Sequence, residues 1–291
     1  MFILFEKRGF FRENRGYNGA IKRNAGVSTD EAFPGMTEIL RNVVICMDLM
    51  MLPEFVKLAL FMLAVFISNI VQALTGFAGV MLSIPPTILL YGPDMAKAVI
   101  NAICWLVCAL LMYQNRQYIN PKELLRIVVF MLVGMAIGIH LYNVVNPQIL
   151  VPLYGAIIVG AALKSLIFKQ SASALPNWIA IPVLLGAGVI HGMFASGGAL
   201  LVVYLVATFR DKDSFRANVA SVWTILNLVL MFNDYEKGLY NTEFFELLGL
   251  GVIPLVIAIY LGNKIHDMIN QKMFNRVTYC LLLAAGSMIL I

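Results

Sequence analysis

The stretch FVKLALFMLAVFISNIVQAL (residues 55–74) decides the fold class of this protein, because it carries a single charge in twenty residues. A second stretch, WIAIPVLLGAGVIHGMF (residues 178–194), has the same apolar character. Both are close to the roughly 20 residues that cross a bilayer as an α-helix. Lipid offers the backbone no hydrogen bonds, and the polar–apolar alternation of a barrel strand is absent. The sequence therefore predicts an all-α polytopic membrane protein.

The composition extends this prediction to most of the chain. Of 291 residues, 60% are hydrophobic and 13% are charged, whereas soluble domains average roughly 45–50% and 25%. The net charge of +5 does not indicate nucleic-acid binding, because the basic residues stand singly at the ends of apolar runs, as at membrane edges. The cysteines lack metal-ligand spacing, so we expect no metal and no cofactor.

The first fifty residues differ from the rest and include a stretch rich in Gly, Asn and Arg (RGFFRENRGYNGAIKRNAG). We expect residues 1–50 to form an unstructured tail, which is not translated if an internal methionine such as Met51 is the true start. From residue 55 onward we count ten apolar segments. They span 55–74, 77–91, 95–114, 124–145, 148–168, 178–194, 197–209, 214–232, 244–262 and 273–291.

The second and seventh segments are too short for a full membrane span, and each follows a turn of small residues. These turns are TGFAG (75–79) and ASGGA (195–199), and a shift of the sequence by 119 residues superimposes them. The same shift pairs Lys97 with Arg216. We therefore predict two homologous transmembrane repeats of five segments each, residues 55–168 and 178–291.

Five crossings in each repeat would insert the second repeat upside down, and the loop charges agree with this. The loop after the third segment is basic, with Arg116, Lys122 and Arg126, whereas its mate is mainly acidic. The loop after the ninth segment is basic, whereas its mate, NVVNPQ, is uncharged. Basic loops prefer the cytoplasm. The sequence thus predicts an inverted repeat in the cell (inner or plasma) membrane, with both termini outside.

The chain resembles, over residues 55–291, the TauE/SafE (TSUP) family of membrane permeases, whose members carry sulfite and organosulfonates. Each half of that family has a glycine-rich turn, a Pro-containing apolar stretch and a basic-Ala step. The matching residues here are Gly76, Gly79, Pro85, Lys97 and Ala98, then Ser196, Gly197, Gly198, Arg216 and Ala217. The second half has Tyr204 in place of the proline, and the family's small polar pair is only partly present, as Asn101-Ala102 and Ala220-Ser221. The resemblance implies a permease or exporter of small anions and not an enzyme.

Lys97 and Arg216 are the leading candidates for a substrate site. Asp94 and Asp213 are predicted N-caps, which places each basic residue at the third helical position. A cation there opposes the helix dipole, so helix stability does not account for it, whereas a helix N-terminus beside a cation binds anions. The alternative is that each side chain reaches the lipid headgroups or pairs with its aspartate.

The two turns of small residues could present backbone N–H groups to a ligand. Matching breaks in two repeats are where repeat transporters bind substrate, although close helix packing is an alternative role. The predicted substrate-binding residues are Lys97, Arg216, Gly76, Gly79, Ser196, Gly197, Gly198, Asn101 and Ser221.

The energy source for transport is the remaining question. His191 could couple transport to protons, or serve as a neutral packing residue. No carboxylate lies at the middle of a segment. Outward movement of one negative charge gains about 2.3 kcal/mol per 100 mV when the cytoplasm is negative. Export therefore needs no coupling ion, whereas uptake does.

Two other functions compete with transport. Ser196 in FASGG resembles the serine of a rhomboid-type intramembrane protease, but Phe194 stands where such a site requires glycine. A membrane scaffold or assembly protein has no need of duplicated breaks and duplicated basic residues. We expect a small anionic substrate and the lipid bilayer as partners, and no nucleic acid. The sequence does not distinguish a monomer from a homodimer.

Overall fold

The computed structural model describes residues 53–142, 176–194 and 198–290. The chain divides into two compact units, Met1–Leu58 and Ala59–Ile291. Apart from the first turn of one helix, everything below concerns the second unit. The predicted tail, the predicted segment 148–168 and the site residues Ser196 and Gly197 lie outside the described residues.

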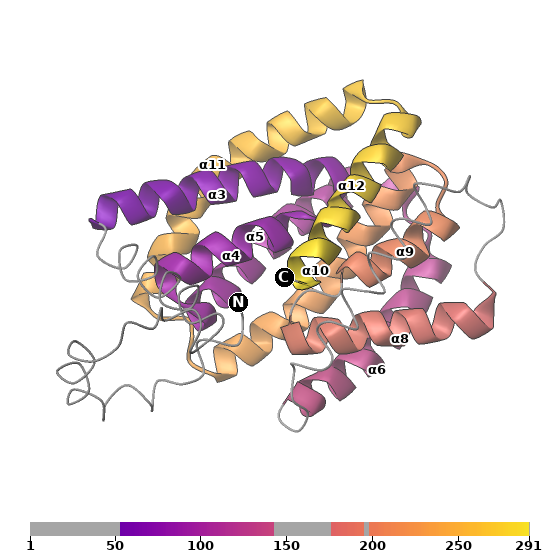
Figure 1. Cartoon of the computed structure of the whole chain (residues 1–291), viewed down its shortest axis with the longest axis horizontal. Coiled ribbons are helices and arrows are strands. Elements are labelled where there is room, and N and C mark those ends of the chain that lie inside the picture. Colours follow the sequence, from indigo (N-terminus) through magenta and orange to yellow (C-terminus); the bar gives the residue numbers. More distant parts are fainter. Residues whose placement is uncertain (1–52, 143–175, 195–197, 291) are drawn as a thin grey trace, which may run out of the picture. The chain divides into compact units, whose positions relative to one another are not determined.

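The described residues are helical and contain no strand (Figure 1). Five of the helices, α3, α5, α6, α10 and α11, are long and apolar enough to cross a membrane. The helices are α3 (Glu54–Thr75), α4 (Gly79–Tyr91), α5 (Pro93–Gln114), α6 (Pro121–Tyr142), α8 (Asn177–Phe194), α9 (Gly198–Thr208), α10 (Lys212–Glu236), α11 (Thr242–Met268) and α12 (Gln271–Leu290), with a 3-10 turn, η3 (Arg116–Tyr118). The predicted multi-pass α-helical membrane protein is confirmed. The predicted short helices are confirmed as well, since α4 has 13 residues and α9 has 11.

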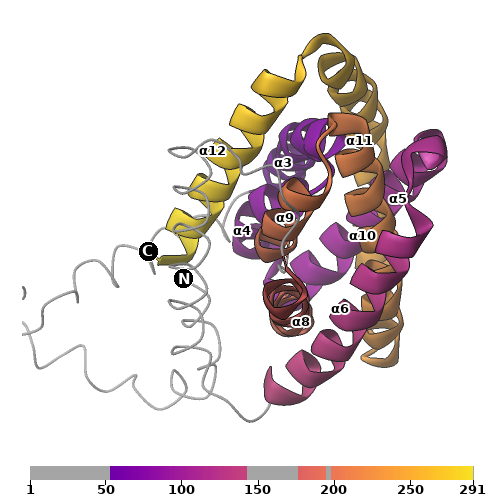
Figure 2. The ribbon, with the colours of Figure 1, turned by 90° about the vertical axis from the view of Figure 1, so that its right-hand side faces the viewer.

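Helices α5 and α10 form the core and pack against each other (Figure 2). In their apolar windows 67% and 72% of residues are buried, against 33% in α6 and 39% in α11. The Trp105 indole of α5 donates a hydrogen bond to the Thr224 carbonyl of α10 over 3.1 Å, and the Asn101 amide donates to the Asn227 carbonyl over 3.4 Å. The two most buried helices are thus joined by polar contacts near their middles.

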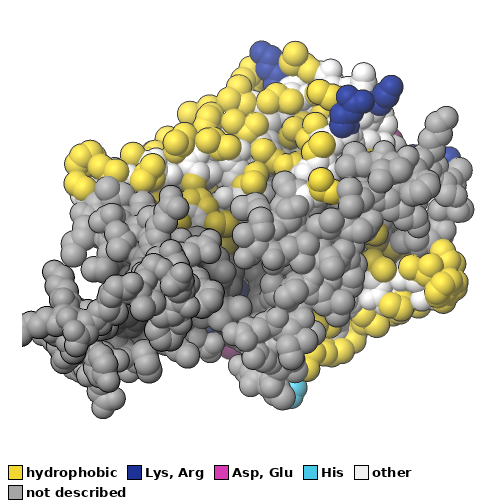
Figure 3. Space-filling model, viewed as in Figure 1, with side chains coloured by type: hydrophobic (Ala, Val, Ile, Leu, Met, Phe, Trp, Pro, Cys, Tyr) yellow, Lys and Arg dark blue, Asp and Glu magenta, His cyan; other side chains and the backbone are white. Residues whose placement is uncertain are grey.

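The outer helices present apolar stripes, as lipid contact requires. Helix α6 exposes Leu125, Val129, Val133 and Ile137, four residues at a helical spacing of four. Hydrophobic side chains also cover much of the described surface in the space-filling view (Figure 3). The hydrocarbon core of a bilayer is the environment that favours such a surface.

Both predicted N-caps are wrong. Helix α5 begins at Pro93, with Gly92 before it at φ 82°, because proline suits the first helical position. Helix α10 begins at Lys212, and its cap is Asp211, whose carboxylate accepts a hydrogen bond from the Ser214 N–H over 2.7 Å. Asp94 and Asp213 are therefore the second residues of their helices, and Lys97 and Arg216 are each the fifth residue, not the third. The equivalence of the two basic residues is unaffected.

Glycines clamp α8 against α6. A Cβ atom added at Gly134 or Gly138 of α6 would overlap backbone atoms of α8. The reverse holds for Gly188 and Gly192 of α8, which face the backbone of α6. Small residues four apart let membrane helices approach this closely. The contact fixes the position of His191, which precedes Gly192.

Replacing Gly188 with alanine should lower the unfolding temperature of the purified protein in detergent, because the added methyl group meets the backbone at Met131. Overpacking of this kind costs about 1–3 kcal/mol, and each kcal/mol is worth roughly 2–4 °C in a chain of this size. Gly249→Ala is the matched control, since nothing lies within 4 Å of the added Cβ and helix propensity improves by about 1 kcal/mol. Equal unfolding temperatures of the two variants would contradict the tight α6–α8 contact.

Candidate functional site

The first turn of small residues interrupts the membrane helices between α3 and α4. Gly76 has φ 87°, a conformation that side chains disfavour. The Gln72 amide holds the turn together: its oxygen accepts from the Gly79 N–H over 2.7 Å, and its nitrogen donates to the Gly76 carbonyl over 3.0 Å. Gly76 also packs on α10, where an added Cβ would lie 2.5 Å from Val219 Cγ1. The Gly79 N–H that sequence reasoning assigned to a ligand is therefore bonded to Gln72.

Arg216 lies beside this turn and is only 4% exposed. Its Nη1 donates to the Ala73 carbonyl over 3.1 Å and to Asn263 Oδ1 over 2.9 Å, and its Nη2 donates to Asn115 Oδ1 over 3.1 Å. The guanidinium thus connects the ends of α3, α5 and α11 to α10. Its Nε has no partner among the described residues. The geometry gives Arg216 a structural role, in which three of its five N–H groups donate to the protein.

His266 of α11 completes the same end of the bundle. Its ring is fully buried, with Nδ1 2.9 Å from the Leu74 carbonyl and Nε2 2.9 Å from Asp213 Oδ1. A carbonyl only accepts hydrogen bonds, so Nδ1 carries a hydrogen. The His266 ring thus joins the last turn of α3 to the first turn of α10. Sequence reasoning gave His266 no role because it lies near a segment end.

At the opposite end of α5 and α10, Lys97 lies within electrostatic range of Asp234. Asp234 is 1% exposed, and its Oδ2 has no hydrogen-bond partner among the described residues. The positive charge of the half-buried Lys97 acts on Asp234 and also on His191. Sequence reasoning placed Asp234 in a loop, whereas the structure buries it in the last turn of α10. The available signal was its 119-residue offset from Asn115, which contacts Arg216.

The contacts between the two predicted repeats are reciprocal. Arg216 meets Asn115 while Lys97 lies within electrostatic range of Asp234, and the 119-residue shift turns each pair into the other. Trp105 and Thr224, which bond to each other, are themselves 119 residues apart. Because Lys97 lies near the end of α10 and Asn115 lies near its start, α5 and α10 run antiparallel.

Asn101 and Ser221, which the sequence analysis predicts to bind substrate, are buried polar residues in the core. Asn101 bonds to the Asn227 carbonyl, as described above, and is 5% exposed. The Ser221 hydroxyl donates to the Ala217 carbonyl of its own helix over 2.7 Å. Neither residue lines the cavity described next, whereas Gly198 does.

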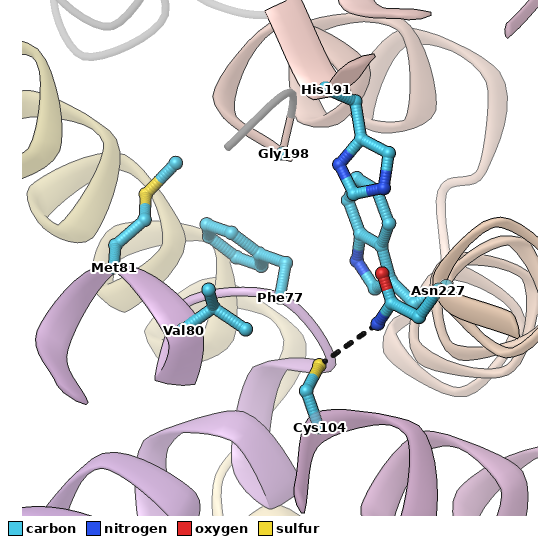
Figure 4. A pocket seen from close by; sticks show the side chains of 8 residues that line it. Phe77, Val80, Met81, Cys104, His191, Gly198 and Asn227 are labelled. Carbon is cyan, nitrogen blue, oxygen red and sulfur yellow. Dashed lines mark hydrogen bonds between the residues drawn. The ribbon is translucent and has the colours of Figure 1, made fainter. Parts of the chain in front are cut away.

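A small cavity lies between the central helices and α4, α8 and α9, with about 20 Å³ open to the centre of a water molecule. One wall carries His191 and Asn227, and the opposite wall carries Phe77, Val80 and Met81 (Figure 4). Trp223 also lines the cavity. Cys104 and Gly198 complete the lining. The rings of His191 and Trp223 are 4.9 Å apart. Neither ring nitrogen of His191 has a hydrogen-bond partner among the described residues, nor does the indole nitrogen of Trp223.

The chain belongs to the TauE/SafE sulfite exporter family, whose model matches residues 60–289. The recognition made from the two turns and the two basic residues is therefore confirmed. Proteins of this family are integral membrane transporters and not enzymes. Neither the curated proteins nor the solved structures include a match to this chain.

Replacing Gly76 with alanine should lower both anion flux in proteoliposomes and the unfolding temperature, because the methyl group strains the backbone and meets Val219 on α10. We expect a loss of stability above about 2 kcal/mol, the sum of a strained φ and an overpacked contact. Gly238→Ala measures the cost of the strained φ alone, since Gly238 has φ 69° but nothing lies within 4 Å of its added Cβ. If the two variants lose the same stability, the turn does not pack tightly on α10.

Proposed function

We propose that this protein moves a small anion across the cell membrane, and that its physiological reaction is the export of sulfite or a short organosulfonate. The observation that carries the proposal is a pair of cations, Lys97 and Arg216, at the fifth position of the two central helices. Ionisable residues within membrane helices are costly and usually mark a transport path. Family membership supports the anion class and the direction.

The two cations differ in how they could serve transport. Both terminal nitrogens of Arg216 donate to protein acceptors, so we assign it mainly to positioning α3 and α5 around α10. Lys97 makes no ion pair within 4.0 Å among the described residues, and its charge reaches His191 at the cavity. Lys97 is therefore the side chain that attracts the anion toward the middle of the bundle.

The driving force can be the membrane potential alone. Moving one negative charge outward gains about 2.3 kcal/mol per 100 mV when the cytoplasm is negative. A uniporter without a coupling ion is sufficient for export under these conditions.

The two repeats are proposed to be related by an axis in the membrane plane. The antiparallel α5 and α10 and their reciprocal contacts support this arrangement. Exposed basic residues gather at the end where Asn115, Arg216 and Asn263 meet, and dark blue side chains cover the α11–α12 connection there (Figure 3). These residues are Arg116, Lys122, Lys264, Lys272 and Arg276. By the positive-inside rule, this end faces the cytoplasm.

Lys97→Gln should reduce anion flux in proteoliposomes at least about tenfold while leaving the amount of folded protein unchanged, because a charge-assisted contact is worth 1.5 kcal/mol or more. Arg216→Gln should also lower the unfolding temperature, since it removes donors from three buried acceptors. Lys237→Gln is the matched control, an exposed charge at the same end of the bundle as Lys97. Normal flux in the Lys97→Gln, Arg216→Gln double variant would remove both residues from the path.

Single cysteines at Gln117 and Lys237, introduced after replacement of the native cysteines, should label from opposite sides of the membrane. Both positions are exposed, one after α5 and the other after α10. A membrane-impermeant maleimide should label Lys237→Cys in intact cells, and Gln117→Cys only after permeabilisation. Labelling of both from the same side would refute the inverted arrangement.

A further inference from the structure

We propose that the cavity between His191, Trp223 and Met81 is the substrate site, that uncharged N–H donors bind the anion there, and that it selects a monoanion with a short apolar body. This inference rests on the proposed anion transport and adds the site and its selectivity. The cavity lies beside Cys104 and Trp223, each the twelfth residue of its central helix. Substrate sites of repeat transporters lie near the bilayer midplane.

At the equivalent positions of the first predicted repeat, the polar side chain forms its hydrogen bonds within the protein. The 119-residue shift pairs His191, Trp223 and Asn227 with Gln72, Cys104 and Cys108. Gln72 Nε2 donates to Cys108 Sγ over 3.2 Å, and its Oε1 accepts from the Gly79 N–H over 2.7 Å. Each polar group of the Gln72 amide therefore has a partner within the protein.

In the second predicted repeat, the equivalent residues His191 and Trp223 do not satisfy their polar groups within the described part of the protein. His191 is 2% exposed and Trp223 is 5% exposed, yet the ring nitrogens of both lack partners among the described residues. The Asn227 amide contacts Cys104 Sγ over 3.3 Å (Figure 4). Buried donors without acceptors are unfavourable and uncommon in folded proteins. A ligand that accepts hydrogen bonds would satisfy them.

Two further features of the cavity favour a negatively charged ligand. Helix α9 begins at Gly198, which lines the cavity, and the first N–H groups of a helix have no intrahelical acceptors and favour negative charge. The charge of Lys97 also acts on His191. An imidazole offers at least one N–H whatever its protonation state, and an indole only donates. The polar wall thus presents donors and a positive potential.

The opposite wall limits what the anion can be. Phe77, Val80 and Met81 offer no hydrogen bonds, and the unbranched Met81 side chain can move to admit a small group. An inorganic dianion such as sulfate directs oxygens to every side and would bury some of them against carbon, at a high desolvation cost. A short alkanesulfonate directs its oxygens to one end and carbon to the other. Its shape and its single charge match the two walls.

The unmodified protein provides the first test. The full chain, purified in detergent, is titrated with ethanesulfonate or sulfate, and the rise in unfolding temperature with ligand concentration gives the dissociation constant. We expect ethanesulfonate to bind at least tenfold more tightly than sulfate, and to be carried in proteoliposomes. Tighter binding of sulfate would overturn the proposed selectivity. Absence of flux for any small anion would instead overturn the proposed function.

Conservative variants test the site. Trp223→Phe removes the indole donor, and His191→Phe removes both ring nitrogens while keeping an aromatic ring against residue 223. Each should weaken ethanesulfonate binding roughly 10- to 100-fold, the value of a hydrogen bond to a charged group. His191→Gln restores an amide donor, as in the first repeat, and should recover part of the affinity.

Trp178→Phe is the matched control, because it makes the same chemical change at a residue that is 76% exposed. We expect its dissociation constant to equal that of the unmodified protein. Retention of the unmodified unfolding temperature without ligand identifies variants that fold normally. Wild-type affinity in normally folded His191→Phe and Trp223→Phe proteins, with transport intact, would show that the substrate binds elsewhere.

Discussion

A helix that ends among packed helices must find partners for its last backbone carbonyls within the protein, because water does not reach them there. Helix α3 stops in this way at Thr75, before the turn at Gly76. Arg216 donates to the Ala73 carbonyl, the ring of His266 bonds to the Leu74 carbonyl, and the Gly76 N–H donates to the Gln72 carbonyl over 2.6 Å. Cationic or N–H groups at a helix C-terminus also complement its dipole. The position of α10 and α11 against α3 depends on satisfying this broken helix end.

Because of this requirement, Arg216 and Lys97 have different roles, although they occupy matching positions in the two predicted repeats. Arg216 donates hydrogen bonds to the Ala73 carbonyl of α3 and to the side chains of Asn115 and Asn263, and so it holds the bundle together. Lys97, at the other end of the central pair, lies within electrostatic range of a buried carboxylate, Asp234, and of the cavity. Basic residues at matching positions of the two predicted repeats can thus have different roles. Arg216 stabilises the bundle, and Lys97 is proposed to attract the anion.

The cavity depends on a second constraint, the close contact of α6 and α8. Their glycines bring the two backbones together, which fixes His191 against Trp223 of α10. In the first repeat the equivalent Gln72 closes the space through its own hydrogen bonds. In the predicted alignment of the two repeats, the closed and the open version of the cluster differ at three positions, with Gln72, Cys104 and Cys108 in place of His191, Trp223 and Asn227.

The sequence by itself determined the class of protein, the existence of nearly every described helix and the family, and it predicted the equivalence of Lys97 with Arg216. Those features follow from local properties, namely apolar run length, small-residue breaks and a repeated offset, which need no knowledge of distant contacts. The N-caps at Asp94 and Asp213 were predicted wrongly, because Pro93 and Asp211 compete for the same helix starts. Only the tertiary structure shows that Asp234 is buried and that the Nη atoms of Arg216 donate to protein acceptors. Only the tertiary structure also shows that the ring nitrogens of His191 have no partner among the described residues. Each of these depends on which acceptors a fold brings within about 3 Å, and two of the three acceptors of Arg216 lie more than a hundred positions away in the chain.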